Sequence, residues 1–389
     1  MAERSAAAPP APVHGTALAP RMRVRYSYLP QQFEHPEEIF DAIRAHLNTC
    51  RLTLGPEVEE FERAFASLIG TRHAIGVGSG TDALTLSLRA LGIGPGDEVI
   101  TAANTFIATV GAINATGARP VLVDVTPSFT IDPALMARAL TPRTKAIIPV
   151  HLSGEVADMD PILELAGRRG LPVVEDACQA ISASVGGRAA GTMGLLGCFS
   201  LHPLKNLNVW GDAGVIVTND SDLNARLRLL RNHGLTGRDE VEILGYNSRL
   251  DSIQAIVGNW LIRQVQEITN RRIANAATYD QAFAALEGDI QLPPRRLGVR
   301  RVFHLYQVYA KDRDGLLRHL HAQGVEAKVH YPIPLPQQRA LAHLGYRPGD
   351  FPQTERQAAS LITLPVDQHL TDGEVRYVIE TVTQFYRGS

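Results

Sequence analysis

The stretch of sequence that decides the fold is LPVVEDACQAISASVGGRAAGTMGLLGCFSLHPLKNLNVWGDAG, residues 171–214. It opens with a short apolar run that is typical of a buried strand and leads straight into Asp176. Lys205 follows 29 positions later (205 − 176), in a turn rich in proline and glycine that precedes a second apolar run, GVIVTN. The pattern therefore predicts a carboxylate at the end of a buried strand and a lysine held in a nearby turn.

An acid and a lysine in this arrangement are the two charges that a pyridoxal phosphate enzyme requires. The lysine forms a Schiff base with the cofactor, and the carboxylate keeps the pyridine nitrogen protonated so that the ring accepts electrons. The alternative is a pair of solvated surface charges, which spacing alone favours because lysine and aspartate are seldom buried. The rest of the chain has to decide between the two interpretations.

Length and composition exclude several classes of protein. The chain has 389 residues, 45% of them apolar, and a net charge of −2, which predicts a large core and two domains. The near-neutral charge, without a long basic run, argues against a nucleic-acid partner. No apolar run is long enough for a membrane helix. Cys50, Cys178 and Cys198 are too few for a disulfide or zinc framework, so we expect a cytoplasmic protein.

The composition changes along the chain and suggests its domain boundaries. Residues 1–25 are rich in alanine and proline and lack the apolar segment of a signal peptide, so we expect a mobile tail. Residues 26–260 are predicted to form a large cofactor-binding domain, and residues 261–389 a small C-terminal domain. The segment 252–286 has apolar positions at helical spacing and predicts one long helix that connects the two domains.

A glycine-rich turn is the second feature that suggests chemistry. Residues 73–77 read as a strand, Gly78 to Thr81 as a turn and residues 82–91 as a helix. Such a turn directs backbone N–H groups and the positive end of the helix dipole at one spot, which suits a phosphate. The alternative is an ordinary strand-to-helix turn. A P-loop lysine and a GxGxxG pattern do not occur, which disfavours nucleotide hydrolysis and dinucleotide binding.

Strand and helix patterns alternate between residues 96 and 177. This alternation favours a largely parallel sheet with helices on both faces, and ligands bind such sheets at the carboxyl ends of the strands. His151, Asp176 and the pair Thr105–Phe106 all follow predicted strand ends. We therefore expect them to line a single crevice.

Several segments occur in the order and spacing of a known family. They are GVGSGTDALTLSLRALGIGPGDEVI, NTFIATVGAI, PVHLSGEVADMDPI, VVEDACQA, SLHPLKNLNVWGDAG, RNHG, GYNSRLDSIQA and KVHYPIPLP. From Tyr26 to its end the chain resembles the DegT/DnrJ/EryC1/StrS aminotransferases. The resemblance implies an α/β fold of fold-type I, with a mostly parallel seven-stranded sheet in the large domain and a smaller C-terminal α/β domain. It also implies transfer of an amino group from glutamate or glutamine to a keto-sugar, with pyridoxal 5′-phosphate as cofactor and pyridoxamine 5′-phosphate as its intermediate form.

The resemblance also implies roles for individual residues. Lys205 would form the Schiff base, Asp176 would pair with the pyridine nitrogen, Gln179 would face the ring oxygen O3′ and Phe106 would stack on the ring. The expected phosphate contacts are Gly80, Thr81 and Ser200 of the same subunit and Asn247 of the neighbouring one. That last contact implies a homodimer with shared active sites.

Candidate substrate contacts are His202, Arg249, His330 and Tyr331. For Arg249, an ion pair with Asp251 is the alternative. No HxxH or HExxH spacing occurs on a helix, so no metal site is expected.

The chain departs from the family at two places. Ile181 stands where His is common, a change that we expect to affect packing only. The lysine motif HPLKNLN places His202, Asn206 and Asn208 around the lysine, which suggests a subgroup with a different sugar.

Three rival functions remain open on the sequence. Some relatives are sugar dehydratases that depend on pyridoxamine phosphate, but they replace the lysine with histidine. A regulatory relative would keep the fold and the cofactor without turning over. A plain α/β binding protein would bind no pyridoxal phosphate.

Overall fold

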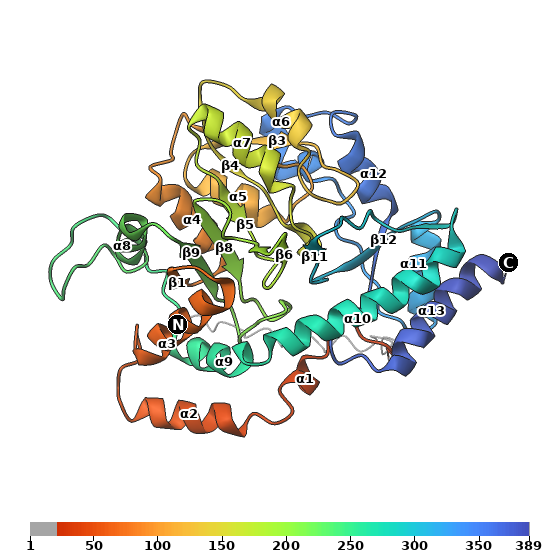
Figure 1. Cartoon of the computed structure of the whole chain (residues 1–389), viewed down its shortest axis with the longest axis horizontal. Helices are drawn as coiled ribbons and strands as arrows, with labels where there is room; N and C mark the ends of the chain where they lie inside the picture. Colours follow the sequence, from red (N-terminus) through yellow and green to blue (C-terminus); the bar gives the residue numbers. More distant parts are fainter. Residues whose placement is uncertain (1–21, 389) are drawn as a thin grey trace, which may run out of the picture.

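The computed structural model describes residues 22–388, and its centre is a twisted sheet of seven strands (Figure 1). The strands follow the order β3-β2-β4-β5-β8-β9-β1, in which bridges from Ile147 to Val173 and from Val150 to Asp176 join β4 to β5. All neighbours are parallel except β9, which is antiparallel to β8 and β1. The strands are β1 (His73–Val77), β2 (Glu98–Ala102), β3 (Arg119–Val123), β4 (Thr144–Ile148), β5 (Val174–Asp176), β8 (Leu196–Ser200) and β9 (Gly214–Thr218). The predicted fold class is confirmed.

Helices cover both faces of this sheet because alternate strand residues are apolar on both sides. Ile75 and Ile216 pack with one helix layer, whereas their neighbours Ala74 and Val217 pack with the other. The first layer consists of α4 (Gly80–Ala90), α5 (Ile107–Ala115) and α8 (Ser221–Leu230). The second contains α2 (Glu37–Leu47), α3 (Pro56–Ile69), α6 (Pro133–Ala139), α7 (Met159–Arg169) and α9 (Ser252–Ile262).

The smaller C-terminal domain has its own apolar core. Its antiparallel sheet comprises β10 (Ile290–Gln291), β12 (Tyr306–Ala310) and β13 (Leu361–Leu364). The helices of this region are α10 (Val265–Phe283), α11 (Arg313–Ala322), α12 (Pro352–Ser360) and α13 (Asp372–Arg387). Val24 and Tyr28 from the start of the described chain pack in the same core, and α1 (Leu29–Gln32) follows them. Residues 1–21 of the predicted tail lie outside the described residues, and the boundary at residue 260 stays a prediction.

Short elements complete the chain. A small sheet in the order β11-β6-β7 contains β6 (Ser184–Val185), β7 (Arg188–Ala189) and β11 (Val299–Arg300). The 3-10 turns are η1 (Leu152–Gly154), η2 (Ala284–Leu286), η3 (Leu335–Gln337) and η4 (Arg339–Leu344). No helix between residues 22 and 388 is both long enough and apolar enough to cross a membrane.

The prediction of one helix over residues 252–286 is wrong. The chain leaves helical hydrogen bonding at Arg263 and Gln264, so that α9 and α10 are separate helices. The change of core falls within α10 and not at the break: Val265 and Ile268 still pack in the large-domain core with Leu261, whereas Tyr279 and Phe283 lie in the C-terminal core. In Figure 1, α10 runs from the large domain to the small one.

Candidate active site

A cavity of about 390 Å³ lies at the carboxyl ends of the central strands. Its walls come from the segments that directly follow β1, β2, β5 and β8, which is where parallel sheets bind ligands. The opposite wall is formed by Tyr26 and by His304, Leu305, His330 and Tyr331 of the C-terminal domain. The cavity is therefore built jointly by the two domains.

Asp176 places a buried carboxylate on the floor of this cavity. It is the last residue of β5 and is only 5% exposed. Its Oδ2 accepts a hydrogen bond from Thr109 Oγ1 at 2.7 Å, and its Oδ1 accepts one from the backbone N–H of Cys178 at 3.2 Å. Thr109 is in turn 2.8 Å from the hydroxyl of Thr105. These donors orient the carboxylate but leave it without a cationic partner in hydrogen-bonding contact.

His151 does not line the cavity, so its predicted place in the crevice is wrong. The strand alternation turns Glu175 to the opposite side of β5 from Asp176, and His151 Nε2 lies 2.8 Å from the Glu175 carboxylate. His151 Nδ1 accepts the backbone N–H of Ala157 at 3.0 Å, so Nε2 carries the proton and donates to Glu175. The same carboxylate accepts backbone N–H groups of Gly191, Met193 and Gly194. The side chains of His151 and Glu175 are fully buried, and this cluster anchors β5 beneath the cavity.

Lys205 lines the cavity from the turn that follows β8. Its backbone N–H donates to the carbonyl of His202 at 2.8 Å, which closes the turn. Burial lowers the pKa of the Lys205 amine, while the Cys178 thiol and the Asp176 carboxylate oppose this shift. A lowered pKa keeps more of the amine neutral, which is the form that attacks a carbonyl carbon. The other lysines of the chain, Lys145, Lys311 and Lys328, lie outside the cavity.

The β1–α4 turn brings the predicted phosphate residues together. Ser79 caps α4 by accepting the backbone N–H of Asp82 at 3.0 Å, and Gly80 and Thr81 form the first turn. Gly80 is required here because a Cβ at this position would lie 2.7 Å from Cβ of Ser200. The free N–H groups of the helix start and the Ser200 hydroxyl therefore meet at one end of the cavity.

Phe106, Gln179 and Tyr331 form the side walls. The ring of Phe106 is 51% exposed, and its centroid lies 6.0 Å from that of Tyr331. Gln179 Oε1 accepts the backbone N–H of Ser153 at 2.7 Å, and the Gln179 side chain also hydrogen-bonds to Tyr331. Burial raises the pKa of the Tyr331 hydroxyl to about 12, so it remains a neutral donor.

Three histidines reach the cavity, and sequence reasoning missed one of them. His202 and His330 were predicted; burial lowers the pKa of His330 to about 4, and its Nδ1 lies 2.9 Å from the Thr363 hydroxyl. His304 was missed; it lies just before β12, which begins at Tyr306. Burial lowers the pKa of His304 well below its usual value, and its Nδ1 has no hydrogen-bond partner. Tyr26 and Asp212 also line the cavity and were not predicted.

Asn247 and Arg249 do not line the cavity of their own subunit. Both belong to the segment 231–251, which projects outward between α8 and α9 (Figure 1). Asn247 is exposed and pairs with Asn232 through a β-bridge. Arg249 Nη1 donates to Asn232 Oδ1 at 3.2 Å, so its observed partner is this amide and not Asp251. A contact of Asn247 with a neighbouring subunit stays a prediction.

Metal-binding clusters and disulfides are not seen in the part of the chain that the structure describes. No group of three or more His, Cys, Asp or Glu side chains between residues 22 and 388 could hold a metal ion. Cys50, Cys178 and Cys198 are all free thiols.

Comparison with known proteins identifies the family. The pattern of the DegT/DnrJ/EryC1/StrS aminotransferase family matches residues 34–383. The chain belongs to this family. The predicted resemblance is confirmed over nearly the whole of the described region.

The similar proteins include enzymes and proteins named for regulation. The pleiotropic regulatory protein of Geobacillus stearothermophilus is 41% identical over 369 residues, 94% of this chain and 99% of the relative. The dTDP-3-amino-3,4,6-trideoxy-α-D-glucose transaminase of Streptomyces venezuelae is 44% identical over 345 residues, 88% of this chain and 91% of the relative. The solved structure of S. venezuelae DesV in complex with a ketimine intermediate has a TM-score of 0.91 at 42% identity and covers 94% of this chain and 99% of its own. Other similar structures are described in forms with pyridoxamine phosphate or pyridoxal phosphate.

The lowered pKa of Lys205 predicts a specific pH dependence of its reactivity. In cofactor-free protein, acylation of Lys205 should reach its half-maximal rate at a lower pH than acylation of the exposed Lys145, because only the neutral amine reacts. Both rates can be followed in one sample by mass spectrometry of the two peptides after brief treatment with a small acylating reagent. Equal midpoints for the two lysines would contradict the burial argument.

Proposed function

We propose that the protein is a pyridoxal phosphate-dependent aminotransferase that moves an amino group from glutamate or glutamine to a keto-sugar. The observation that carries this proposal is the meeting of Asp176, Lys205 and the start of α4 in one cavity. Pyridoxal phosphate has three groups that a protein must contact. The carboxylate matches its ring nitrogen, the amine of lowered pKa matches its aldehyde, and the helix N-terminus matches its phosphate.

The cavity residues divide the task of holding the cofactor. Asp176 is buried and has no cationic partner in hydrogen-bonding contact. Its carboxylate can therefore accept a hydrogen bond from the N–H of a protonated ring nitrogen. Gly80, Thr81 and Ser200 would receive the phosphate, while Phe106 and Gln179 would flank the ring. When bound, the cofactor supplies an electron sink for the negative charge that develops when an amino acid loses its α-proton.

Lys205 would carry the proton between carbons. Its amine would hold the cofactor and, once released by the entering amino donor, would accept the α-proton and return it at another carbon. Burial helps both roles, because a lowered pKa keeps the released amine neutral and therefore basic. The Asp176 carboxylate would face the ring nitrogen.

The remaining walls suit a polyhydroxylated substrate. His202, His304, His330 and Tyr331 present neutral hydrogen-bonding groups, and burial lowers the pKa of the histidines so that they stay neutral. Sugar hydroxyls are both donors and acceptors, which such groups can satisfy without a charge penalty. The transaminase of S. venezuelae named above carries a deoxysugar in its name, which supports a keto-sugar for this chain.

A homodimer with shared sites completes the proposal. Asn247 lies too far along the projecting segment 231–251 to line its own cavity, and that segment also exposes Val241, Leu244 and Tyr246. Leu244 is 93% exposed, and an isolated chain gains no stability from a large apolar side chain that faces water. We infer that the segment covers the cavity of a second copy and brings Asn247 to its phosphate end. Free thiols throughout the chain support a reducing compartment, the cytoplasm.

A regulatory role is the second candidate, because one similar protein is named a pleiotropic regulatory protein. A dehydratase is disfavoured by Lys205, since a histidine at this position could move protons but could not form the bond to the cofactor. Neither of these two functions transfers the nitrogen of the amino donor to a sugar.

The function is tested by following that nitrogen. We expect protein treated with nitrogen-15 glutamate or glutamine and then with a panel of keto-sugars to yield a labelled sugar amine, identified by mass. Lys205→Ala should transfer no label, whereas Lys145→Ala, a control outside the cavity, should match the parent. Label released as ammonia together with a deoxy-keto-sugar would contradict the proposal, as would bound cofactor without any turnover.

The shared site is tested by mixing two inactive variants. Lys205→Ala and Asn247→Ala homodimers should each be inactive or weakly active. Subunits exchanged between them should recover activity, because one of the two sites in a mixed dimer contains both native residues. If mixed dimers form, as shown by native mass spectrometry, but stay as inactive as the parents, Asn247 does not act across the interface.

A further inference from the structure

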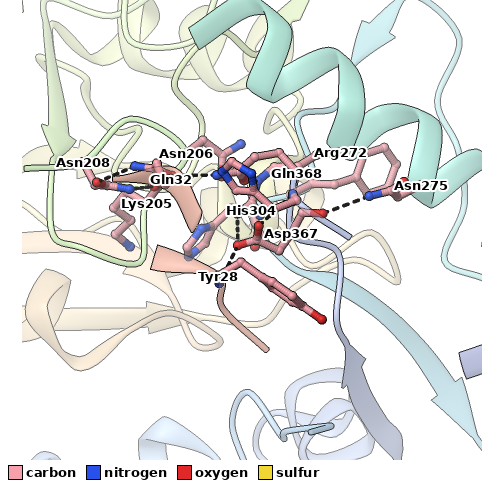
Figure 2. A network of polar contacts seen from close by, with 12 residues as sticks. Tyr28, Gln32, Lys205, Asn206, Asn208, Arg272, Asn275, His304, Asp367 and Gln368 are labelled. Carbon is pink, nitrogen blue, oxygen red and sulfur yellow. Dashed lines mark hydrogen bonds and ion pairs between the residues drawn. The ribbon is translucent and has the colours of Figure 1, made fainter. Parts of the chain in front are cut away.

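A continuous chain of side-chain hydrogen bonds connects the C-terminal domain to the turn that carries Lys205 (Figure 2). Arg272 Nε donates to Gln368 Oε1 at 2.9 Å, and Gln368 Nε2 donates to Gln32 Oε1 at 2.6 Å. Gln32 Nε2 then donates to Asn208 Oδ1 at 2.9 Å, and Asn208 Nδ2 donates to the backbone carbonyl of Lys205 at 2.9 Å. We call this chain the amide relay.

The two ends of the amide relay determine the direction in which its hydrogen bonds donate. A guanidinium can only donate, and a backbone carbonyl can only accept. Each amide between Arg272 and Lys205 must therefore accept on one side and donate on the other, in the same sense along the whole relay. Hydrogen bonds aligned in this way polarise one another, more so in an interior of low dielectric.

Most of the relay is shielded from water, and only its member Gln368 is half-buried. Gln32 is 7% exposed, Asn208 2% and Arg272 6%, so a broken link leaves a buried amide without a partner. The positive charge at its start is balanced locally, since Asp367 lies 3.6 Å from Arg272. Asp367 also accepts the backbone N–H of Tyr28 at 3.4 Å, which holds the segment that leads into α1.

Arg272 holds the opposite wall of the cavity with the same guanidinium. Its Nη1 donates to the backbone carbonyls of Phe303 at 3.3 Å and His304 at 3.4 Å. One buried cation therefore contacts both the wall that carries His304 and, through the relay, the turn that carries Lys205. Figure 2 shows Gln32 in the middle of this connection, contributed by a helix of only four residues.

We propose that Gln32 and Arg272 are positioning residues that set the place of Lys205 relative to the C-terminal wall of the cavity. The relay acts on the backbone of the turn, so it holds the amine inside the cavity without touching it. This inference rests on the proposed function only in that Lys205 is taken as the lysine that binds the cofactor. Loss of a link lets the turn relax toward water, where the amine regains its hydration.

The proposal is tested on cofactor-free protein with Gln32→Leu and a matched control, Gln31→Leu, which changes the exposed neighbour on the same helix. Gln32→Leu should raise the pH at which Lys205 acylation is half-maximal and speed deuterium uptake in residues 202–209 about tenfold. Gln31→Leu should leave both values at those of the parent. The groups that face the Lys205 amine are unchanged in these variants: Asp176, Cys178, His202, His304 and His330.

A second set of variants separates positioning from a general loss of packing. Gln32→Glu keeps the shape and still accepts from Gln368, but it cannot donate to Asn208, so it should shift both readouts in the same direction as Gln32→Leu. Because the links are in series, Asn208→Ala combined with Gln32→Leu should be little worse than either alone. Parent-like values in Gln32→Glu and Gln32→Leu, or additive effects in the double variant, would overturn the proposal. Neither readout depends on amino transfer. The proposed function and the positioning role of the relay can therefore be refuted independently of each other.

Discussion

Asp176 keeps a carboxylate in the protein interior, where a charge without a partner costs several kcal/mol. The surrounding elements supply part of what this charge requires. Thr109 at the start of α5 and the backbone N–H of Cys178 donate to it, and Glu175, the neighbouring strand residue, fixes β5 from beneath. The remaining requirement, a cation, is what a protonated pyridine ring provides. The strand, the cavity and the expected cofactor therefore follow from one electrostatic constraint.

The same reasoning explains why the cavity lies between two domains. The large domain supplies the acid, the lysine and the start of α4, but its side of the cavity is open toward the C-terminal domain. His304 and His330 close it from that side, and burial keeps them uncharged. A site assembled from two domains requires that their relative position be fixed. The amide relay from Arg272 to the turn of Lys205 is a contact that can do so.

The parts of the fold that sequence patterns predicted are those determined by local physics. Apolar runs of strand length, the glycine-rich turn before α4 and the positions of Asp176 and Lys205 could all be read in order. The Thr371–Glu374 capping box at the start of α13 is likewise set by local contacts. His151 was misplaced because a residue just past a strand end can face either side of the sheet, and only the packing against Glu175 decides which.

What the sequence could not reveal depends on contacts between distant segments. Gln32 meets Asn208 and Gln368, and nothing in the tetrapeptide that surrounds Gln32 distinguishes it from Gln31. His304 was hidden in an apolar stretch that continues into β12. The break between α9 and α10 was missed because the apolar spacing persists through it, and Val265 and Ile268 of α10 still pack in the core that α9 fills.

The most direct test of the central claim is the rate of α-proton loss from a deuterated amino donor in Asp176→Asn, compared with the parent and with Asp160→Asn on the surface of α7. If Asp176 holds the ring nitrogen, loss of this charge pair should cost about 3 to 5 kcal/mol. That corresponds to a rate lower by about two to four orders of magnitude, with cofactor still bound. A rate for Asp176→Asn within about threefold of the parent would contradict the account.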